Sequence, residues 1–517
     1  MDYCDYEADG DAAAAPKRVF TEQTSLNEGV RPAAADEDGD VPNNWRRKNT
    51  VWRIERKKEH LFHQFMENTT LHGVKYVTNP AHSKQRRLIW MVLFVIMLVI
   101  VSCAIFSHFQ EYFAYATKTV ITYKTPHKTS FPSVVICNCN KFRISALNGS
   151  QWEELLPMVN TNGVYYSEQI EKLKAGKYFN VNAEEELRIK GANYRELGLA
   201  LSHEFEGMLL DCRWAGRYRC SAANFTQVWT DFGVCYVFNG QDTTRVDDDG
   251  EGLMADNTGL DGGLWVRLNV EQSEHASSNT GSCFKVAIQP RGDVYFVRDA
   301  GRTVQPGYHS IIGLKKQVRK SMESPYDTHC RKDGLKYYNG YSINACRMEC
   351  LTNDTMEKCG CIAPFMPESS GFPYCDLITL ITCVAHRIGF PYCECNTPCS
   401  EILYDERVSY SQAPSIDSNK EVQMLFNWSK EEVSENILEI SIYFEDLREQ
   451  WTIQEAAYGL TALMSSIGGE LGLCLGGSII TVFEFADYLL TRQALHFRLF
   501  KRKFSNVGRL KRRDHPV

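Results

Sequence analysis

The pattern of apolar and polar positions divides the 517-residue chain into two long apolar runs with a mixed region between them. The first run, Leu88–Phe106, reads LIWMVLFVIMLVIVSCAIF and has the length and purity of one helical membrane crossing. Basic residues precede it and aromatic residues follow it, which predicts that residues 1–87 lie in the cytosol. A buried core helix is the alternative, and this uninterrupted apolar composition disfavours it.

The second run, Ala456–Leu490, is longer than one crossing needs and is interrupted repeatedly by glycine. It also carries three carboxylates, Glu470, Glu484 and Asp487. Carboxylates at membrane depth usually face a water-filled path or a partner, and glycine-rich backbone is tolerated there where it lines a cavity or packs closely. The basic tail, 491–517, predicts a cytosolic C-terminus. We therefore expect two crossings, both termini inside, and residues 107–455 outside.

The outer region mixes strand-like and helix-like patterns, which predicts an α+β ectodomain. Five strands are expected at Phe131–Asn138, Val234–Gly240, Leu264–Val270, Cys283–Gln289 and Ile437–Leu447, the last running straight toward the second crossing. Two helices are expected at Ser167–Lys174 and Ala183–Glu196, and a long acidic loop at Val246–Asp261. The net charge of −7 excludes a strongly basic nucleic-acid binder.

Nineteen cysteines are many for a cytosolic protein, and their placement says more than their number. Sixteen lie between Cys137 and Cys399, whereas Cys4, Cys103 and Cys474 lie elsewhere. An even set confined to one region predicts a disulfide framework in an oxidising compartment. Zinc binding by the closely spaced cysteines is the alternative. Glycosylation sequons beyond the first crossing favour the disulfides: Asn148, Asn224, Asn353 and Asn427.

Several short motifs occur in order along the chain. ENTTLHG (Glu67–Gly73) precedes the first crossing, FPSVVICN follows it, and SSIGGELGLCLGGSIITVFEFADY (Ser465–Tyr488) forms the second. Between them stand CRMEC (Cys346–Cys350), KCGCIAPFMP (Lys358–Pro367) and YCECNTPC (Tyr392–Cys399). Together these motifs resemble the degenerin/epithelial sodium channel superfamily, which includes acid-sensing and peptide-gated channels.

The resemblance implies a plasma-membrane channel with two transmembrane helices per subunit, assembled in the lipid bilayer as a trimer of the same or related subunits. It implies an ectodomain shaped as a clenched hand, with palm, β-ball, finger, thumb and knuckle regions. The second crossing would line a pore that selects Na+ and that amiloride blocks. No enzyme activity, cofactor or nucleic-acid partner is expected, because no nucleophile–base set or metal motif stands out.

Gly476-Gly477-Ser478 matches the Gly-x-Ser selectivity filter of the superfamily. Small residues let backbones approach a common axis and offer carbonyl and hydroxyl oxygens to a small cation, although close helix packing is the alternative use of such a triplet. Glu484 and Asp487 follow the filter, where carboxylates would attract cations or pair with the basic tail. Glu470 precedes it, where an extra carboxylate could raise the affinity for divalent ions.

Four residues are expected to act in gating: Ser465, Ser466, His72 and Gly73. Ser465 matches a position at which the superfamily requires a small residue. Ser466 stands where the superfamily often has Asp or Asn, so the contacts that it makes at the gate are not predicted by the resemblance. His72-Gly73 matches the intracellular His-Gly pair tied to gating and to the inner ion path.

The resemblance also implies a disulfide pairing: Cys137–Cys235, Cys212–Cys220, Cys330–Cys399, Cys346–Cys395, Cys350–Cys393, Cys359–Cys383 and Cys361–Cys375. The last five would form a ladder that stiffens the thumb. Cys139 and Cys283 are left over, and pairing with each other is the simplest inference. Such cross-links would let a ligand event in the finger or thumb reach the pore as a rigid-body motion.

The stimulus that opens the channel is marked less clearly. The stretch Tyr112–Thr117, where acid-sensing relatives carry a His pair, has no histidine, which argues against proton gating. The acidic run Asp247–Glu251 could hold carboxyls with raised pKa or bind calcium as a modulator, although such runs are usually solvated. The basic residues near Cys212 do not form an Arg-x-x-Arg cleavage site.

We therefore expect an extracellular ligand, a short neuropeptide as in the peptide-gated branch, with proton gating as the alternative and mechanical gating through partners as a further one. Outside the channel class, a non-conducting two-pass adhesion or receptor protein would not need the Gly-Gly-Ser triplet or Glu484 within a span. An ATP-gated purinergic channel would need clustered outer basic residues and a different cysteine order.

Overall fold

The fold is taken from a computed structural model. It describes residues 58–148, 150, 152–153, 191–241, 252–275, 281–368, 372–387, 393–413, 420, 423–424 and 426–510. The chain divides into two compact units, and each is considered by itself. The outer unit is Leu98–Cys474, and the inner unit joins Met1–Met97 to Leu475–Val517.

The outer unit is built around an eight-stranded sheet, in the order β1-β15-β12-β14-β9-β4-β5, with β13 also paired to β12. The strands are β1 (Thr117–Lys124), β4 (Leu209–Trp214), β5 (Tyr218–Arg219), β9 (Leu264–Asn269), β12 (Tyr308–Lys320), β13 (Ser400–Gln412), β14 (Ile437–Phe444) and β15 (Glu449–Ala456). The 13-residue strand β12 pairs antiparallel with β13 and parallel with both β14 and β15. It therefore holds the middle of the sheet together.

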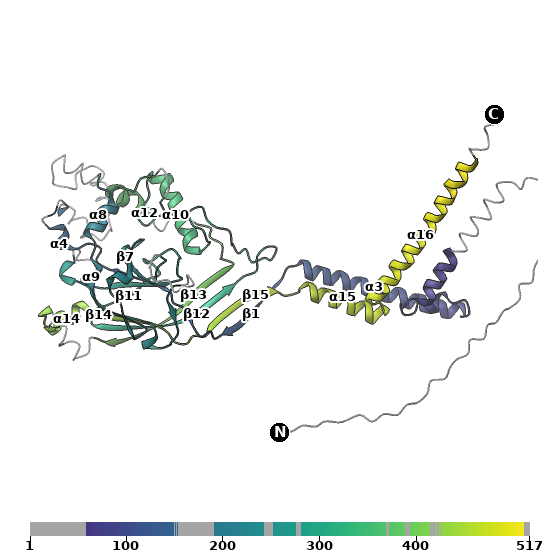
Figure 1. Cartoon of the computed structure of the whole chain (residues 1–517), viewed down its shortest axis with the longest axis horizontal. Helices are drawn as coiled ribbons and strands as arrows, with labels where there is room; N and C mark the ends of the chain where they lie inside the picture. The colour runs from purple at the N-terminus through teal and green to yellow at the C-terminus, as the bar shows by residue number, and fades with distance from the viewer. Residues whose placement is uncertain are drawn as a thin grey trace, which may run out of the picture. The chain divides into compact units, whose positions relative to one another are not determined.

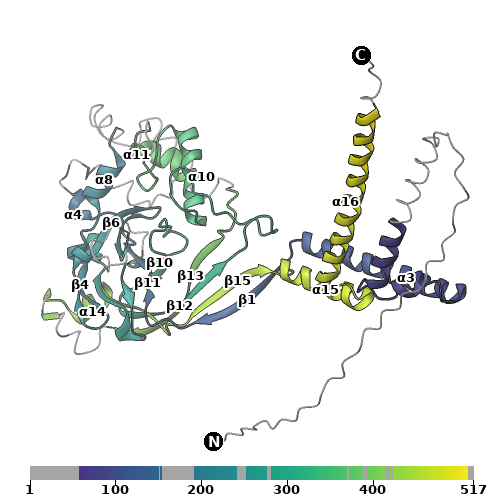
Figure 2. The same ribbon diagram turned by 45° about the vertical axis from the view of Figure 1, so that its right-hand side comes forward.

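Strands β1 and β15 lie side by side in both views, as a ribbon of eight antiparallel residue pairs (Figures 1 and 2). The strand β1 follows helix α3 (Lys84–Phe113), and β15 leads into helix α15 (Leu460–Leu475). Two elements far apart in sequence, each next to an apolar helix, are thus joined by one backbone ladder. Motion of this ribbon would reach α3 and α15 together.

A five-stranded sheet, in the order β11-β10-β3-β7-β6, shares its core with the larger sheet. Its strands are β3 (Ser133–Asn138), β6 (Phe225–Thr230), β7 (Gly233–Phe238), β10 (Phe284–Gln289) and β11 (Arg302–Val304). Inward side chains of both sheets, such as Ile136 and Phe238 from one and Val266 and Ile440 from the other, form one buried cluster. A short pair, β2 (Thr129–Ser130) with β8 (Met254–Ala255), lies beside them.

The helices of the outer unit lie around the sheets, and α10 and α12 are neighbours in Figure 1. The longest, α10 (Ile343–Cys359), begins after the N-cap Ser342, whose side chain accepts a hydrogen bond from the Ala345 N–H. It ends at Gly360, whose φ of +71° suits a left-handed C-terminal cap. The others are α4 (Ile144–Leu147), α8 (Tyr194–Leu201), α9 (Phe205–Met208), α11 (Leu377–Thr379), α12 (Ala385–Arg387) and α14 (Lys430–Asn436), with a π-helical turn at Leu380–Val384.

Eight disulfides cross-link the outer unit, and they coincide with the pairs that the resemblance implies, including Cys139–Cys283. Cys346 and Cys350 anchor α10 to Cys395 and Cys393, and Cys359 links its end to Cys383. Cysteines four residues apart lie on one face of a helix, so both bonds hold the same face. The cysteines therefore do not form a metal site there.

The predicted strands correspond to β3, β7, β9, β10 and β14, with small shifts at their ends. The expectation for Ile437–Leu447 was wrong in one respect: β14 ends at Phe444, and β15 stands between it and the second apolar region. The described part of the predicted acidic loop, 252–261, holds β8 and the start of a 3-10 turn, Leu260–Gly262. The predicted helix Ser167–Lys174 lies outside the described residues, as do 183–190 of the second predicted helix, which meets α8 only at its end.

The inner unit contains a helix at 58–68, α2 (Val74–Thr78), the first half of α3, and α16 (Ile479–Leu510). Phe65 stacks on Tyr488 with 4.7 Å between ring centroids, and Tyr76 stacks on Trp90 at the same separation. The Arg87 guanidinium donates to the Val77 carbonyl at 2.8 Å. The segment before α3 is thereby packed on both α3 and α16.

Among the described helices, α3 is long and apolar enough to cross a membrane, and it contains the predicted span Leu88–Phe106. The pair Leu460–Leu475 and Ile479–Ala494 meets the same criterion only when taken together, and it is bent by 76° at the break between its members. The predicted segment Ala456–Leu490 therefore starts on the last residue of β15 and stops inside α16.

Candidate ion pathway

The break between α15 and α16 lies at the predicted filter. The helix α15 ends at Leu475, α16 begins at Ile479, and Gly476, Gly477 and Ser478 lie between them. Gly476 has a φ of +67°, a left-handed value that side chains with a Cβ rarely adopt. A Cβ at this position would also lie 2.5 Å from the His72 ring carbon Cγ. Two independent constraints therefore require glycine at 476.

His72 and Gly73 lie directly against this break. The His72 backbone N–H donates to the Leu475 carbonyl at 2.8 Å, which satisfies one of the carbonyls that a helix C-terminus leaves without an intrahelical partner. Gly73 has a φ of +84° and precedes α2, so the chain turns sharply away after this contact. The structure thus brings together the His-Gly pair and the first residue of the predicted filter, which are about 400 positions apart in the sequence.

Ser478 occupies the N-cap position of α16, and its contacts extend to the carboxylate of Glu484. The Ser478 backbone N–H donates to Thr481 Oγ1 at 2.9 Å, the geometry of a capping interaction from the third helical residue. Thr481 Oγ1 lies 2.6 Å from Thr70 Oγ1. Glu484 Oε2 accepts from the Thr70 N–H at 3.1 Å and from Thr69 Oγ1 at 3.2 Å.

The remaining predicted pore and gate residues lie on the same two helices. Asp487 is exposed on α16, one turn beyond Glu484. Glu470, Ser465 and Ser466 lie on α15 within the outer unit. Sequence reasoning missed Thr70 and Thr481, although Thr70 stands inside the quoted ENTTLHG motif. The available signal was the spacing of Thr481 from Ser478, which is that of a capping pair.

The chemistry of the break suits a small cation. Irregular backbone exposes carbonyl oxygens, the Ser478 side chain is exposed and adds a hydroxyl oxygen, and the C-terminus of α15 contributes a partial negative charge. These are hard oxygen ligands with no acid–base pair or nucleophile among them. The arrangement can replace part of the hydration shell of an ion, which is the task of a filter.

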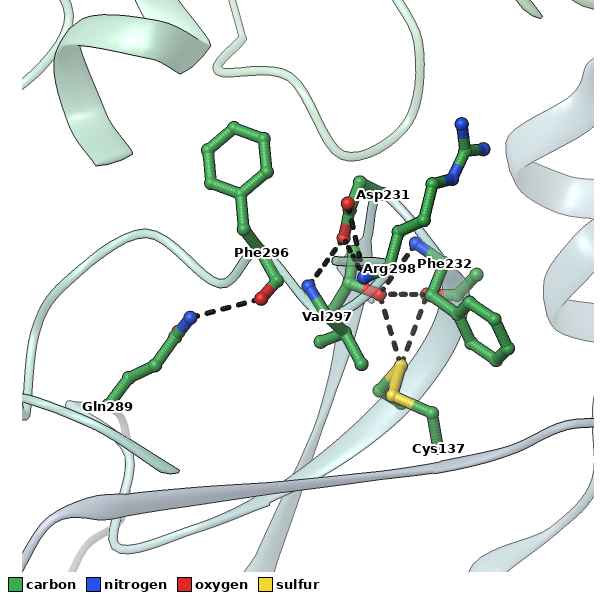
Figure 3. The surroundings of a disulfide bond; sticks show 10 residues. Cys137, Asp231, Phe232, Gln289, Phe296, Val297 and Arg298 are labelled. Carbon is green, nitrogen blue, oxygen red and sulfur yellow. Dashed lines mark hydrogen bonds between the residues drawn. A yellow bond between two sulfur atoms is a disulfide. The ribbon is translucent and has the colours of Figure 1, made fainter. Parts of the chain in front are cut away.

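Two carboxyl groups of the outer unit have raised pKa values. Asp293 is half-buried, and desolvation raises the pKa of its carboxyl, although Ser342, the N-cap of α10, and Asn344 in its first turn donate hydrogen bonds to its two oxygens. Burial likewise raises the pKa of Asp231, which accepts from the backbone N–H groups of Val297 and Arg298 (Figure 3). Asp293 thereby connects the segment after β10 to the start of α10.

The buried residue His203 links three loops of the outer unit. The His203 side chain is 2% exposed, and its Nδ1 lies 2.5 Å from Glu271 Oε2. Its Nε2 lies 2.9 Å from Asn140 Nδ2, and the Asn140 amide donates to the carbonyls of Phe142 and Glu274. These contacts tie the segment after β3 to the turn after β9.

Comparisons with known proteins identify the family. The profile of the family described as "Amiloride-sensitive sodium channel" matches residues 65–488. Human acid-sensing ion channel 2 is 29% identical over 450 residues, covering 82% of this chain and 85% of the relative. Zebrafish (Danio rerio) acid-sensing ion channel 1C is 28% identical over 476 residues, covering 87% and 86%. Acid-sensing ion channel 1 of Gallus gallus is 28% identical over 443 residues, covering 82% of each chain.

Among solved structures, a proton-activated chloride channel aligns over 80% of this chain and 96% of its own, with 7% identity. The TM-score of 0.30 is too low to indicate a shared fold. The family match covers most of the chain, including the His-Gly pair, the cysteine-rich region and the filter segment. The chain therefore belongs to the amiloride-sensitive sodium channel family of plasma-membrane ion channels, and it is not an enzyme.

Proposed function

We propose that this chain is a subunit of a trimeric, Na+-selective, amiloride-blocked channel that opens when the extracellular solution becomes acid. Gly476–Ser478 form its filter, Glu484 and Asp487 lie on the cytosolic side of that filter, and both termini are cytosolic. The named relatives are acid-sensing channels, which supports protons over the neuropeptide expected from the sequence. No comparison supports a peptide ligand.

The proposed proton trigger rests on the raised pKa of Asp293. A carboxyl whose pKa is raised by burial takes up its proton closer to neutral pH than an ordinary aspartate does. The conformation in which Asp293 is more buried binds that proton more tightly, so acid favours that conformation and neutral pH favours a more exposed one. Because Asp293 accepts from Ser342 and Asn344, this equilibrium acts on the start of α10, the helix fixed by three disulfides.

The test is voltage clamp of oocytes expressing the full chain alone, with the bath stepped from about pH 7.5 to about pH 5. We expect an inward Na+ current on acidification that amiloride blocks and that K+ carries less well. A current evoked by amidated peptides at constant pH, with none on acidification, would overturn the proton trigger and leave the channel assignment standing. A silent chain that reaches the surface would instead indicate a required partner subunit.

Asp293→Asn identifies the trigger group. An asparagine mimics the neutral carboxyl, so the half-activating pH should move toward neutral or a standing current should appear at about pH 7.5. Asp333→Asn is the matched control, because Asp333 is an exposed carboxylate near the start of the same helix. An unchanged half-activating pH in Asp293→Asn, with normal surface expression, would remove Asp293 from the mechanism.

A further inference from the structure

We infer that Thr70 and Thr481 form a hydroxyl relay that positions the filter and thereby sets the preference for Na+ over K+. The inference rests on the proposed role of Gly476–Ser478 as the filter. It assigns a positioning function to two threonines that belong to neither the Gly-x-Ser nor the His-Gly motif. All of its members lie within the inner unit.

One direction of donation links all members of the relay, and the Ser478 hydroxyl lies beside it, 3.5 Å from Thr481 Oγ1. The Ser478 N–H donates to Thr481 Oγ1 at 2.9 Å, so the Thr481 hydroxyl hydrogen is available to Thr70 Oγ1 at 2.6 Å. The Thr70 hydroxyl hydrogen then points to Glu484 Oε2, at 3.4 Å. Each hydroxyl donates once and accepts once, and the chain ends on a carboxylate, the strongest acceptor available. Hydrogen bonds arranged head to tail in this way strengthen one another.

The relay and the His-Gly pair hold opposite ends of the same three-residue segment. His72 caps the Leu475 carbonyl and packs against Gly476, whereas Thr70 reaches Ser478 through Thr481. Residues 70–72 therefore fix the segment at both ends with one short stretch of chain. Thr481 is 7% exposed, so its hydroxyl has little access to water as a substitute partner.

The spacing of oxygen ligands decides how well a filter replaces the hydration shell of one cation over another. If Ser478 were held less firmly, the filter oxygens could adopt the wider spacing that suits the larger ion, and K+ permeability would rise. Glu484 then has two functions: its charge attracts cations, and its Oε2 is the last acceptor of the relay. Loss of Thr70 should then affect selectivity even though Thr70 carries no charge.

The primary test measures the Na+/K+ permeability ratio from reversal potentials in the full-length channel. Thr70→Val and Thr481→Val keep the shape and remove the hydroxyl, and each should lower the ratio about 3- to 10-fold, the effect of one lost hydrogen bond. The double variant should be no worse than either single one, since both break the same chain. Thr70→Ser and Thr481→Ser keep the hydroxyl and should retain the ratio.

Thr78→Val is the matched control, because the Thr78 hydroxyl donates within its own helix α2, to the Val74 carbonyl at 3.2 Å. Ser478→Ala separates this inference from the filter assignment. A changed ratio in Ser478→Ala with an unchanged ratio in both valine variants overturns the relay and leaves the filter. An unchanged ratio in Ser478→Ala as well would overturn the filter role together with the relay.

Two further measurements cover variants that conduct poorly. Valine variants that pass no current alone are co-expressed with the wild-type chain, where incorporated variant subunits should still lower the ratio. Hydrogen exchange of the purified full-length protein should show faster exchange of the Ser478 amide in Thr70→Val and Thr481→Val but not in Thr78→Val. Unchanged exchange would overturn the relay without any reference to current.

Discussion

At the residue scale, the filter segment shows how one position can be fixed by two different physical constraints. Gly476 needs glycine for its left-handed backbone and for its contact with the His72 ring. The triplet can be predicted from sequence by its small side chains and by family resemblance. The contact of Gly476 with His72 cannot, because the two residues are about 400 positions apart and only the folded chain brings them together.

Gly476→Ala should lower the amiloride-sensitive current at least about tenfold at equal surface expression. The backbone strain and the steric clash together cost more free energy than corresponds to a tenfold change in an equilibrium constant. The variant is measured by voltage clamp with surface biotinylation. Adding His72→Ala should restore part of the current by relieving the clash, whereas the backbone strain remains.

Gly459→Ala is the control for this prediction, because a Cβ there meets no atom within 4 Å in the described part of the chain. Its current should match the wild type. A Gly476→Ala channel with normal current would show that the left-handed turn is not needed for conduction.

At the element scale, periodicity found the strands that carry continuous apolar runs and missed those that do not. The strands β3, β7, β9, β10 and β14 are buried on both faces or nearly so, and they read as apolar runs. The strands β12 and β13 are rich in Lys, Glu and Ser, and β1 is exposed along most of its length. The strand β12 is stabilised by pairing with β13, and β1 by pairing with β15. Both pairings are non-local, so a short window of sequence does not reveal them.

The contact between α8 and the five-stranded sheet leads to a prediction about the stability of the ectodomain. Gly198 on α8 lies against Trp229 of β6, and an added Cβ would come within 2.2 Å of the indole ring. Gly198→Ala should therefore destabilise the ectodomain by about 1–3 kcal/mol, despite the better helix propensity of alanine. Thermal unfolding of the purified protein, followed by tryptophan fluorescence, measures this.

Gly281→Ala serves as the comparison, since a Cβ at Gly281 meets no atom within 4 Å among the described residues. The two variants should separate clearly in midpoint temperature. Equal midpoints would mean that Trp229 moves aside without loss of packing.

At the scale of the whole molecule, the cysteine-rich motifs and the apolar regions, taken in order, were enough to predict the family and its disulfide-rich mixed α/β ectodomain. The pairing of Cys139 with Cys283, reached by elimination, also agrees with the structure. The stimulus was not predictable in the same way. The stretch Tyr112–Thr117 beside the first crossing holds no histidine. The groups with shifted pKa values lie within the ectodomain, where burial and not sequence position sets their proton affinity.

The response of ectodomain stability to acid follows from opposing contributions of these groups. Burial lowers the pKa of His309 below its usual 6.5, while the neighbouring Glu439, itself paired with Arg267, acts in the opposite direction. The unfolded chain therefore binds this proton more readily, and the stability linked to neutral His309 is lost as the pH falls below about 6.5. The raised pKa values of Asp231 and Asp293 act the other way, because the folded state takes up those protons first as the pH falls.

His309→Asn should therefore flatten the loss of thermal stability below about pH 6.5, because asparagine does not titrate, although it gives up the contact of His309 Nε2 with Ser441 Oγ at 2.8 Å. Melting temperatures of the full-length protein between about pH 7.5 and pH 5 measure the slope, with the exposed His127→Asn as the control. Asp231→Asn should have the opposite effect and steepen the loss, because it removes a proton that the folded state prefers to bind. If His309→Asn and the control give the same slope, His309 is not the group through which acid weakens the fold.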